Sequence, residues 1–128
     1  MSHTNLTLSL LADTFSICRL GPEAEIPSWT LAGDFFSVTR TKEELSLVCP
    51  QEMVPEGTPC EGDFRSIKVE GPLDFALVGV LASLTEALAQ EEISILAIST
   101  FDTDYLLVKE AQVDRAVQKL SQAGHRFV

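Results

Sequence analysis

The stretch LDFALVGVLASLTEALAQEEISILAISTFDTDYLLV, residues 73–108, decides the fold that this sequence predicts. Its apolar pattern predicts a strand, an amphipathic helix beginning at Val80, a second strand, a tight turn and a third strand. The turn carries two aspartates, Asp102 and Asp104, between two of the most apolar segments of the chain. Set opposite the strand-to-helix junction at Gly79, these carboxylates could form one side of a small polar site.

The segments around this stretch complete a familiar order of elements. Residues 64–70 alternate like a strand, and a second amphipathic helix ends before Gly124, its expected C′ glycine. Residues 93–100 are so apolar that we expect this strand to be central or covered on both faces. With a short last strand at 125–128, the second half reads β-α-β-β-α-β, the ferredoxin-like order.

The first half of the chain shows the same order with its helices reduced to turns. Residues 6–11 and 14–20 predict two short strands, separated by a turn or bulge at Ala12-Asp13. Residues 34–50 predict a hairpin, because two alternating segments are joined by the short polar connection TKEE.

Residues 51–63 contain two prolines and two glycines and are the best candidate for a linker. We therefore predict an α+β protein of two tandem ferredoxin-like units. Residues 1–63 form the first unit, with degenerate helices, and residues 64–128 form the complete second unit.

Composition narrows the function classes. The chain has 128 residues, of which 45% are hydrophobic, enough for a packed core. Its formal net charge of −10 argues against nucleic acid and against an anionic membrane surface as partners, because phosphate groups attract clustered Lys and Arg. The N-terminus lacks the features of a secretory signal, so we expect a cytoplasmic protein.

The three cysteines form no metal-binding motif. Cys18, Cys49 and Cys60 are widely spaced, with no CxxC pair and no Cys/His ligand set. Cys18 and Cys49 lie in apolar, strand-like runs, which favours positions in the core. We expect neither a metal ion nor another cofactor.

Two segments resemble a known family. FFSVTRTKEELSLVC, residues 35–49, and ISILAISTFDTDYLLV, residues 93–108, resemble the ACT domains of the CASTOR-type arginine sensors and of short stand-alone bacterial proteins. The resemblance extends over about residues 10 to 125. It implies a non-catalytic sensor or regulatory module that binds a free amino acid, with cationic ones such as arginine favoured. It also implies a homodimer, or a site between units, and a regulated protein as a further partner.

The resemblance and the residue chemistry together predict a ligand site. The resemblance implies the backbone of Ser94 and Ile95, a glycine at the strand-to-helix junction, and a Thr-Phe-x-x-Asp set. Free amides at the start of the helix at Val80 suit a ligand carboxylate, and a carboxylate such as Asp104 suits an ammonium or guanidinium. The predicted ligand-binding residues are Gly79, Val80, Ser94, Ile95, Thr100, Phe101 and Asp104.

Each of these residues has a structural alternative. Gly79 could serve helix–strand packing, and Asp102 and Asp104 could be turn residues, with Asp102 the more structural of the two. Phe101 favours a core position over a pocket wall. The alternative function is a protein–protein interaction module with a vestigial pocket. An enzyme is disfavoured, because no phosphate-binding loop, nucleophile elbow or HExxH motif occurs.

Overall fold

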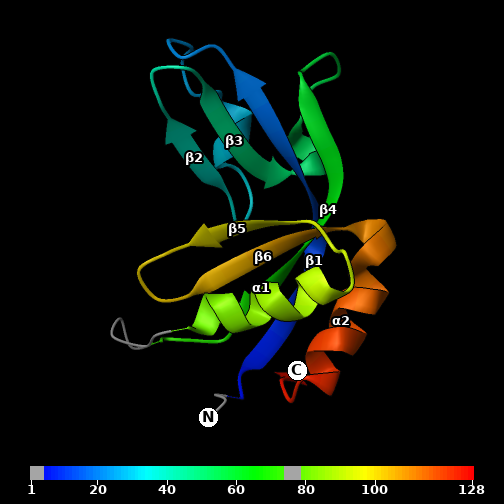
Figure 1. The fold of residues 1–128 in the computed structure, drawn as a ribbon. Helices are drawn as coiled ribbons and strands as arrows, with labels where there is room; N and C mark the ends of the chain where they lie inside the picture. Colours follow the sequence, from blue (N-terminus) through cyan, green and yellow to red (C-terminus); the bar gives the residue numbers. More distant parts are fainter. Residues whose placement is uncertain (1–4, 74–78) are drawn as a thin grey trace. The chain divides into compact units, whose positions relative to one another are not determined.

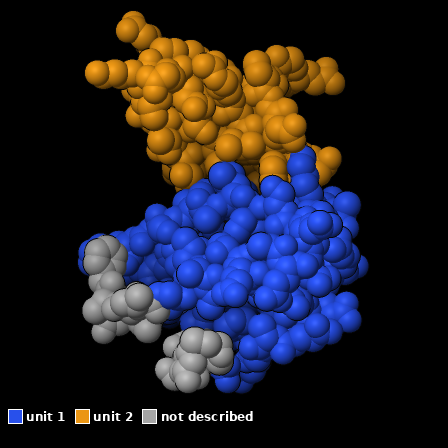
Figure 2. All heavy atoms as spheres, in the orientation of Figure 1, with its two compact units in different colours: residues 1–12, 65–128 blue, residues 13–64 orange. Residues whose placement is uncertain are grey.

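The computed structural model describes residues 5–73 and 79–128. The chain divides into two compact units (Figure 2). Unit 1 consists of residues 1–12 and 65–128, and unit 2 consists of residues 13–64. The predicted domain division at residue 63 stays a prediction, and the described residues 5–12 group with the C-terminal half in unit 1.

Unit 1 has the ferredoxin-like arrangement of an antiparallel sheet and two helices (Figure 1). Its strands follow the order β7-β1-β4-β6-β5, in which β7 pairs parallel to β1. Strands β5 and β6 form an antiparallel hairpin in which Ile95 faces Val108 and Ser99 faces Asp104. The elements are β1 (Thr7–Leu20), β4 (Cys60–Val69), α1 (Val80–Gln90), β5 (Ile95–Ser99), β6 (Asp104–Lys109), η3 (Glu110–Gln112), α2 (Val113–Gln122) and β7 (Arg126–Phe127).

Both helices pack on one face of the sheet of unit 1, because their apolar residues join those of the strands in a single core. Burying such side chains contributes about 1.5–3 kcal/mol each. The helix α2 ends as predicted: Gly124 has a φ of +102° just beyond the helix. The buried core residues include Leu8, Ile67, Leu84, Leu88, Leu106, Val108, Ala116 and Leu120.

Unit 2 contains the C-terminal part of β1 and the start of β4, together with β2 (Ser37–Arg40) and β3 (Leu45–Pro50). The strand β3 pairs antiparallel with both β2 and β1. Short 3-10 turns, η1 (Ser28–Leu31) and η2 (Gln51–Met53), stand where the ferredoxin-like order would place helices. The interpretation of this unit as a degenerate second ACT-like domain is a proposal.

Two predictions about where strands begin and end were wrong in part. Residues 6–11 and 14–20 belong to one continuous strand, since exposed Ala12 and Asp13 keep extended backbone without a turn. The predicted linker ends earlier, because β4 already begins at Cys60.

The apolar strand at 93–100 also differs from its prediction. Among the described strands β5 is the last in the sheet order, and Ala97 and Ser99 are exposed. Small residues occupy its outward positions, which a count of apolar residues does not reveal. The predicted strand at 73–79 falls mostly on residues 74–78, outside the described part of the chain. None of the described helices is long and apolar enough to cross a membrane.

Candidate functional site

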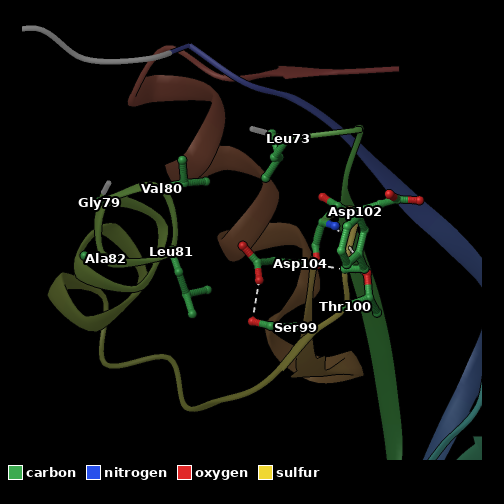
Figure 3. Close-up of a pocket in the computed structure, with 11 residues that line it drawn as sticks. Leu73, Gly79, Val80, Leu81, Ala82, Ser99, Thr100, Asp102 and Asp104 are labelled. Atoms are coloured by element: carbon green, nitrogen blue, oxygen red, sulfur yellow. Dashed lines mark hydrogen bonds between the residues drawn. The ribbon is translucent and has the colours of Figure 1, made fainter. Parts of the chain in front are cut away.

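A hollow of about 340 Å³ lies in unit 1 between the first turn of α1 and the connection from β5 to β6 (Figure 3). This volume is within the range of small-molecule sites, about 300–1,000 Å³. Five of the seven predicted ligand-binding residues line it. The full lining is Leu73, Gly79, Val80, Leu81, Ala82, Ser99, Thr100, Phe101, Asp102, Thr103 and Asp104.

The helix start supplies hydrogen-bond donors on one side of the hollow. Gly79 is the N-cap of α1 and has a left-handed backbone, with a φ of +83°. Among the described residues no side chain caps this helix start, and the first turn of α1 holds no acidic residue. The first backbone N–H groups of a helix have no partner within the helix and carry partial positive charge. They are therefore donors suited to an anionic group.

The role of Gly79 is conformational. A Cβ atom built on this glycine would meet no described atom within 4 Å, so close packing does not explain the residue. Its positive φ does, because L-residues with a side chain are strained in that region. The open space at Gly79 also lets a ligand approach the backbone.

The opposite side is a turn anchored to the sheet. The N–H group of Thr100 donates to the Thr103 carbonyl at 2.8 Å, and the Thr103 N–H donates back to the Thr100 hydroxyl at 3.2 Å. The buried Thr103 hydroxyl donates to the Val69 carbonyl of β4 at 2.6 Å. Thr103 was missed by sequence reasoning, and the spacing of two threonines three residues apart in a turn is the signal that points to it.

The acidic residues of this turn differ in role. The Asp104 carboxylate accepts a hydrogen bond from the Ser99 hydroxyl at 2.5 Å and lies across from the α1 start (Figure 3). The backbone carbonyl of Asp102 accepts from the N–H of Leu73 at 2.8 Å. Phe101 is 82% exposed, so its predicted core position was wrong. A tight turn points this ring outward, whatever the general preference of aromatic residues for burial.

Two predicted residues lie away from the hollow. Ile95 begins β5 and Ser94 precedes it, whereas the turn that borders the hollow follows Ser99 at the other end of that strand. Ser94 is exposed, and Ile95 is half-buried opposite Val108. They do not contribute to this hollow within one chain.

The chemistry of the hollow is mixed. Leu73, Val80 and Leu81 give it an apolar wall, and Asp102 and Asp104 bring two carboxylates. None of the described residues that line it is a lysine or arginine. Helix-start donors facing a carboxylate can hold a molecule that carries both charges. The described residues contain no group of three or more His, Cys, Asp or Glu that could hold a metal ion.

A second hollow, of about 280 Å³, lies within unit 2. The Gln51 side chain is hydrogen-bonded to other residues that line this hollow. Its amide oxygen accepts from the Ser16 hydroxyl at 2.9 Å and from the Asp63 N–H at 2.6 Å. The amide nitrogen of Gln51 donates to the Asp63 carboxylate at 3.0 Å. These polar groups satisfy one another.

Comparison with known proteins places the chain in a family. A family model described as an ACT domain matches residues 60–122, and a second model, described as an N-terminal domain, matches residues 13–57. The Agobacterium tumefaciens protein Atu0741 shares 32% sequence identity, with a TM-score of 0.93, over 98% of this chain and 94% of that one. The chain belongs to the ACT-domain family, whose members are regulatory and typically bind amino acids.

Two further relatives are more distant. The Bos taurus protein named cytosolic arginine sensor for mTORC1 subunit 1 is 27% identical over 99 residues, 69% of this chain. The chain spans only 30% of that sensor's length. The regulatory subunit of aspartate kinase from Thermus flavus has a TM-score of 0.66 at 14% identity, over 94% of this chain and 99% of that one, and shows the fold alone.

Proposed function

We propose that this protein is a non-catalytic sensor or regulatory module that binds a free amino acid in the hollow of unit 1. One observation carries the proposal: the helix start at Gly79 and Val80, which no described side chain caps, lies across a hollow of about 340 Å³ from the Asp104 carboxylate. Amino acids carry a carboxylate and at least one cationic group, which these two sides complement.

The helix start is suited to the α-carboxylate of the ligand. The N–H groups of Val80, Leu81 and Ala82 are the first donors of α1, and the open space at Gly79 admits an approaching anion. A carboxylate at a helix N-terminus gains about 0.3–2 kcal/mol from the helix dipole, in addition to its hydrogen bonds.

The turn is suited to the cationic part of the ligand. Asp104 accepts one described hydrogen bond, from Ser99, and a carboxylate has room for several donors. Asp102 adds a second negative charge, and the exposed Phe101 ring offers a surface on which a guanidinium can stack. A cationic amino acid satisfies more of these groups than a neutral one. Arginine is the preferred candidate, in keeping with the name of the bovine relative.

A homodimer completes the proposed site. Ser94 and Ile95 belong to the predicted ligand set but lie at the far end of β5 from the hollow. In the proposal their backbone faces the hollow of a second copy of the chain. Ser94→Pro, which removes the backbone N–H group, would then weaken binding only in the dimer.

A thermal-shift screen tests this function. Each of the twenty amino acids is added at millimolar concentration, and arginine and lysine are expected to raise the melting temperature most, because a ligand that binds only the folded state stabilises it by mass action. Asp104→Ala should remove the shift. Absence of a shift with all twenty would contradict amino-acid binding.

The second candidate function is a protein–protein interaction module with a vestigial pocket. The exposed ring of Phe101 favours it, because a large apolar side chain at 82% exposure is suited to contact with another protein. Under this alternative Asp104→Ala leaves capture of a partner protein intact while Phe101→Ala weakens it. Under the amino-acid proposal, Asp104→Ala changes the ligand response.

A further inference from the structure

Three cysteines that are far apart in sequence converge in unit 2. Cys18 lies on β1, which is paired on one side with β3, the strand of Cys49, and on the other with β4, the strand of Cys60. All three thiols are free. Cys49 lies on β3, where Ser16 faces it, so its side chain shares a sheet face with Cys18 two residues further along β1.

The pairing of β1 with β4 places Cys18 directly opposite Cys60. The Arg19 N–H donates to the Pro59 carbonyl at 3.0 Å. A Cβ atom on Gly62 would lie 3.2 Å from the Ser16 hydroxyl, so Gly62 faces Ser16. From Ser16 to Arg19 the numbers rise along β1 while those of the facing residues fall from Gly62 to Pro59, so the two strands are antiparallel. In this register Cys18, one residue before Arg19, faces Cys60, one residue after Pro59.

This pair is of the non-hydrogen-bonded type, because the ladder bond joins the next residues, Arg19 and Pro59. The Cα atoms of such a pair are about 4.5 Å apart. Disulfides span Cα separations of about 4.4–6.8 Å. The backbone therefore brings Cys18 and Cys60 within disulfide distance without a change of register.

The two thiols differ in access. Cys60 is exposed and lines the 280 Å³ hollow of unit 2, where a small molecule can reach it. Cys18 is 1% exposed. Burial, with the neighbouring Cys49 and Cys60 thiols, raises the pKa of Cys18 to about 12. A thiol with a raised pKa is rarely ionised, so it reacts slowly with an external oxidant. It can form a disulfide with an adjacent sulfur if its proton is taken up during the attack.

We propose that Cys18 and Cys60 are a modification site, a dithiol that a low-molecular-weight disulfide oxidises to an intrachain cross-link. The Cys60 thiolate attacks one sulfur of the small disulfide, which forms a mixed disulfide and releases one small thiolate. The Cys18 sulfur then attacks the Cys60 sulfur as its proton passes to the departing second thiolate. Two protein thiols lose two electrons, and the small disulfide is reduced to two thiols.

The cross-link would close a loop from residue 18 to residue 60 that contains most of unit 2. Closing a loop of this length restricts the unfolded chain, which raises the melting temperature. Oxidation state would therefore set the stability of unit 2. Cys49, on the strand at the other side of β1, is the competing partner.

The test uses the full chain and oxidised glutathione as the probe. After incubation we expect two of the three thiols to be lost, the chain to remain monomeric on a non-reducing gel, and the melting temperature to rise until dithiothreitol reverses it. Glu-C digestion assigns the bond, because Glu52 and Glu56 separate Cys49 from Cys60 in the sequence. A linked pair of peptides containing Cys18 and Cys60 supports the proposal.

Matched variants sharpen this result. Cys49→Ala should still form the cross-link, whereas Cys60→Ser, at an exposed position, should retain its remaining thiols. A stable mixed disulfide at Cys60, a Cys60–Cys60 dimer, a Cys18–Cys49 bond, or three intact thiols would each overturn the proposal. Because the wild-type digest distinguishes these outcomes, the test does not depend on the folding of any variant.

Discussion

The two units each contain a hollow of comparable size, and the two differ in what their polar groups do. In unit 1 the start of α1 has no cap from a described side chain, and Asp104 lies across from it. In unit 2 the Gln51 amide bonds to Ser16 and twice to Asp63. The polar groups that line the unit 1 hollow are available to a ligand, whereas the Gln51, Ser16 and Asp63 groups of the unit 2 hollow are hydrogen-bonded to one another.

This difference separates a candidate binding site from a structural pocket better than volume does, since about 340 and 280 Å³ are similar. A buried or half-buried polar group that already has its partners gains little from a ligand, because a new hydrogen bond must replace an existing one. When a ligand binds at a helix start without a cap, the free N–H groups exchange only hydrogen bonds to water for hydrogen bonds to the ligand. This difference supports the proposal that a ligand binds in unit 1, and it favours a structural role for the Gln51 network.

The largest expected effect comes from breaking the Gln51 network. Gln51→Ala removes three hydrogen bonds and the support of Asp63, whose φ of +63° is unusual for a residue other than glycine. We expect a loss of about 1–3 kcal/mol in the free energy of unfolding, measured by urea titration. Ser99→Ala removes one exposed bond in the other hollow and should change stability by less than about 0.5 kcal/mol. Equal losses in the two variants would contradict the comparison.

Two glycines provide a matched pair for a smaller effect. Gly79 in unit 1 and Gly57 in unit 2 have φ values of +83° and +87°, and a Cβ atom on either would meet no described atom within 4 Å. Each change to alanine should therefore cost the same backbone strain, about 1–2 kcal/mol. Only Gly79→Ala should also weaken the response to amino acids in the thermal-shift assay. A similar weakening by Gly57→Ala would remove the special role of the α1 start.

The smallest effect is a pH dependence within unit 1. His125 is 8% exposed, and its Nδ1 atom accepts a hydrogen bond from the Leu6 N–H at 3.1 Å, which requires the unprotonated ring nitrogen. Burial lowers the pKa of His125 from its usual value of 6.5. The unfolded chain therefore binds the proton first as pH falls, and stability decreases below pH 6.5 until the folded-state pKa is passed.

The slope of this decrease is at most about 1.4 kcal/mol per pH unit for one group. Urea titrations between about pH 7.5 and pH 5, which spans the range in which histidine titrates, should show this decrease in the wild type. His125→Gln should flatten this part of the profile. An unchanged profile in the variant would show that another group is responsible.

Local patterns in the sequence predicted much of unit 1. The helical spacing from Val80, the C′ glycine Gly124 and the polar turn before Asp104 are short-range features, and the structure contains all three elements. The same patterns brought Gly79, Thr100 and Asp104 to one hollow, because a strand–helix–strand–strand order places those ends together. Their role as ligand contacts remains a proposal.

The features that sequence reasoning missed depend on contacts between distant segments. Thr103 holds the turn through the Val69 carbonyl, and Gln51 holds Asp63 through a side-chain network. Neither partner can be chosen from local periodicity.

The separation of Ile95 from the hollow follows instead from strand length. Four steps of about 3.3 Å from residue 95 to residue 99 keep the two ends of β5 roughly 13 Å apart. The family resemblance likewise implies that the two ends of β5 contribute to the ligand sites of two different units, and this assignment stays a prediction.

A calorimetric titration of arginine into three proteins tests the central claim most directly. The proteins are the wild type, Asp104→Asn in the unit 1 hollow, and Asp63→Asn as the same neutralising change in the unit 2 hollow. We expect the wild type and Asp63→Asn to bind arginine equally well. Asp104→Asn should weaken binding by about 10-fold to 100-fold, the loss of one charged hydrogen bond. Unchanged affinity in Asp104→Asn, or equal weakening by Asp63→Asn, would contradict binding at the unit 1 hollow.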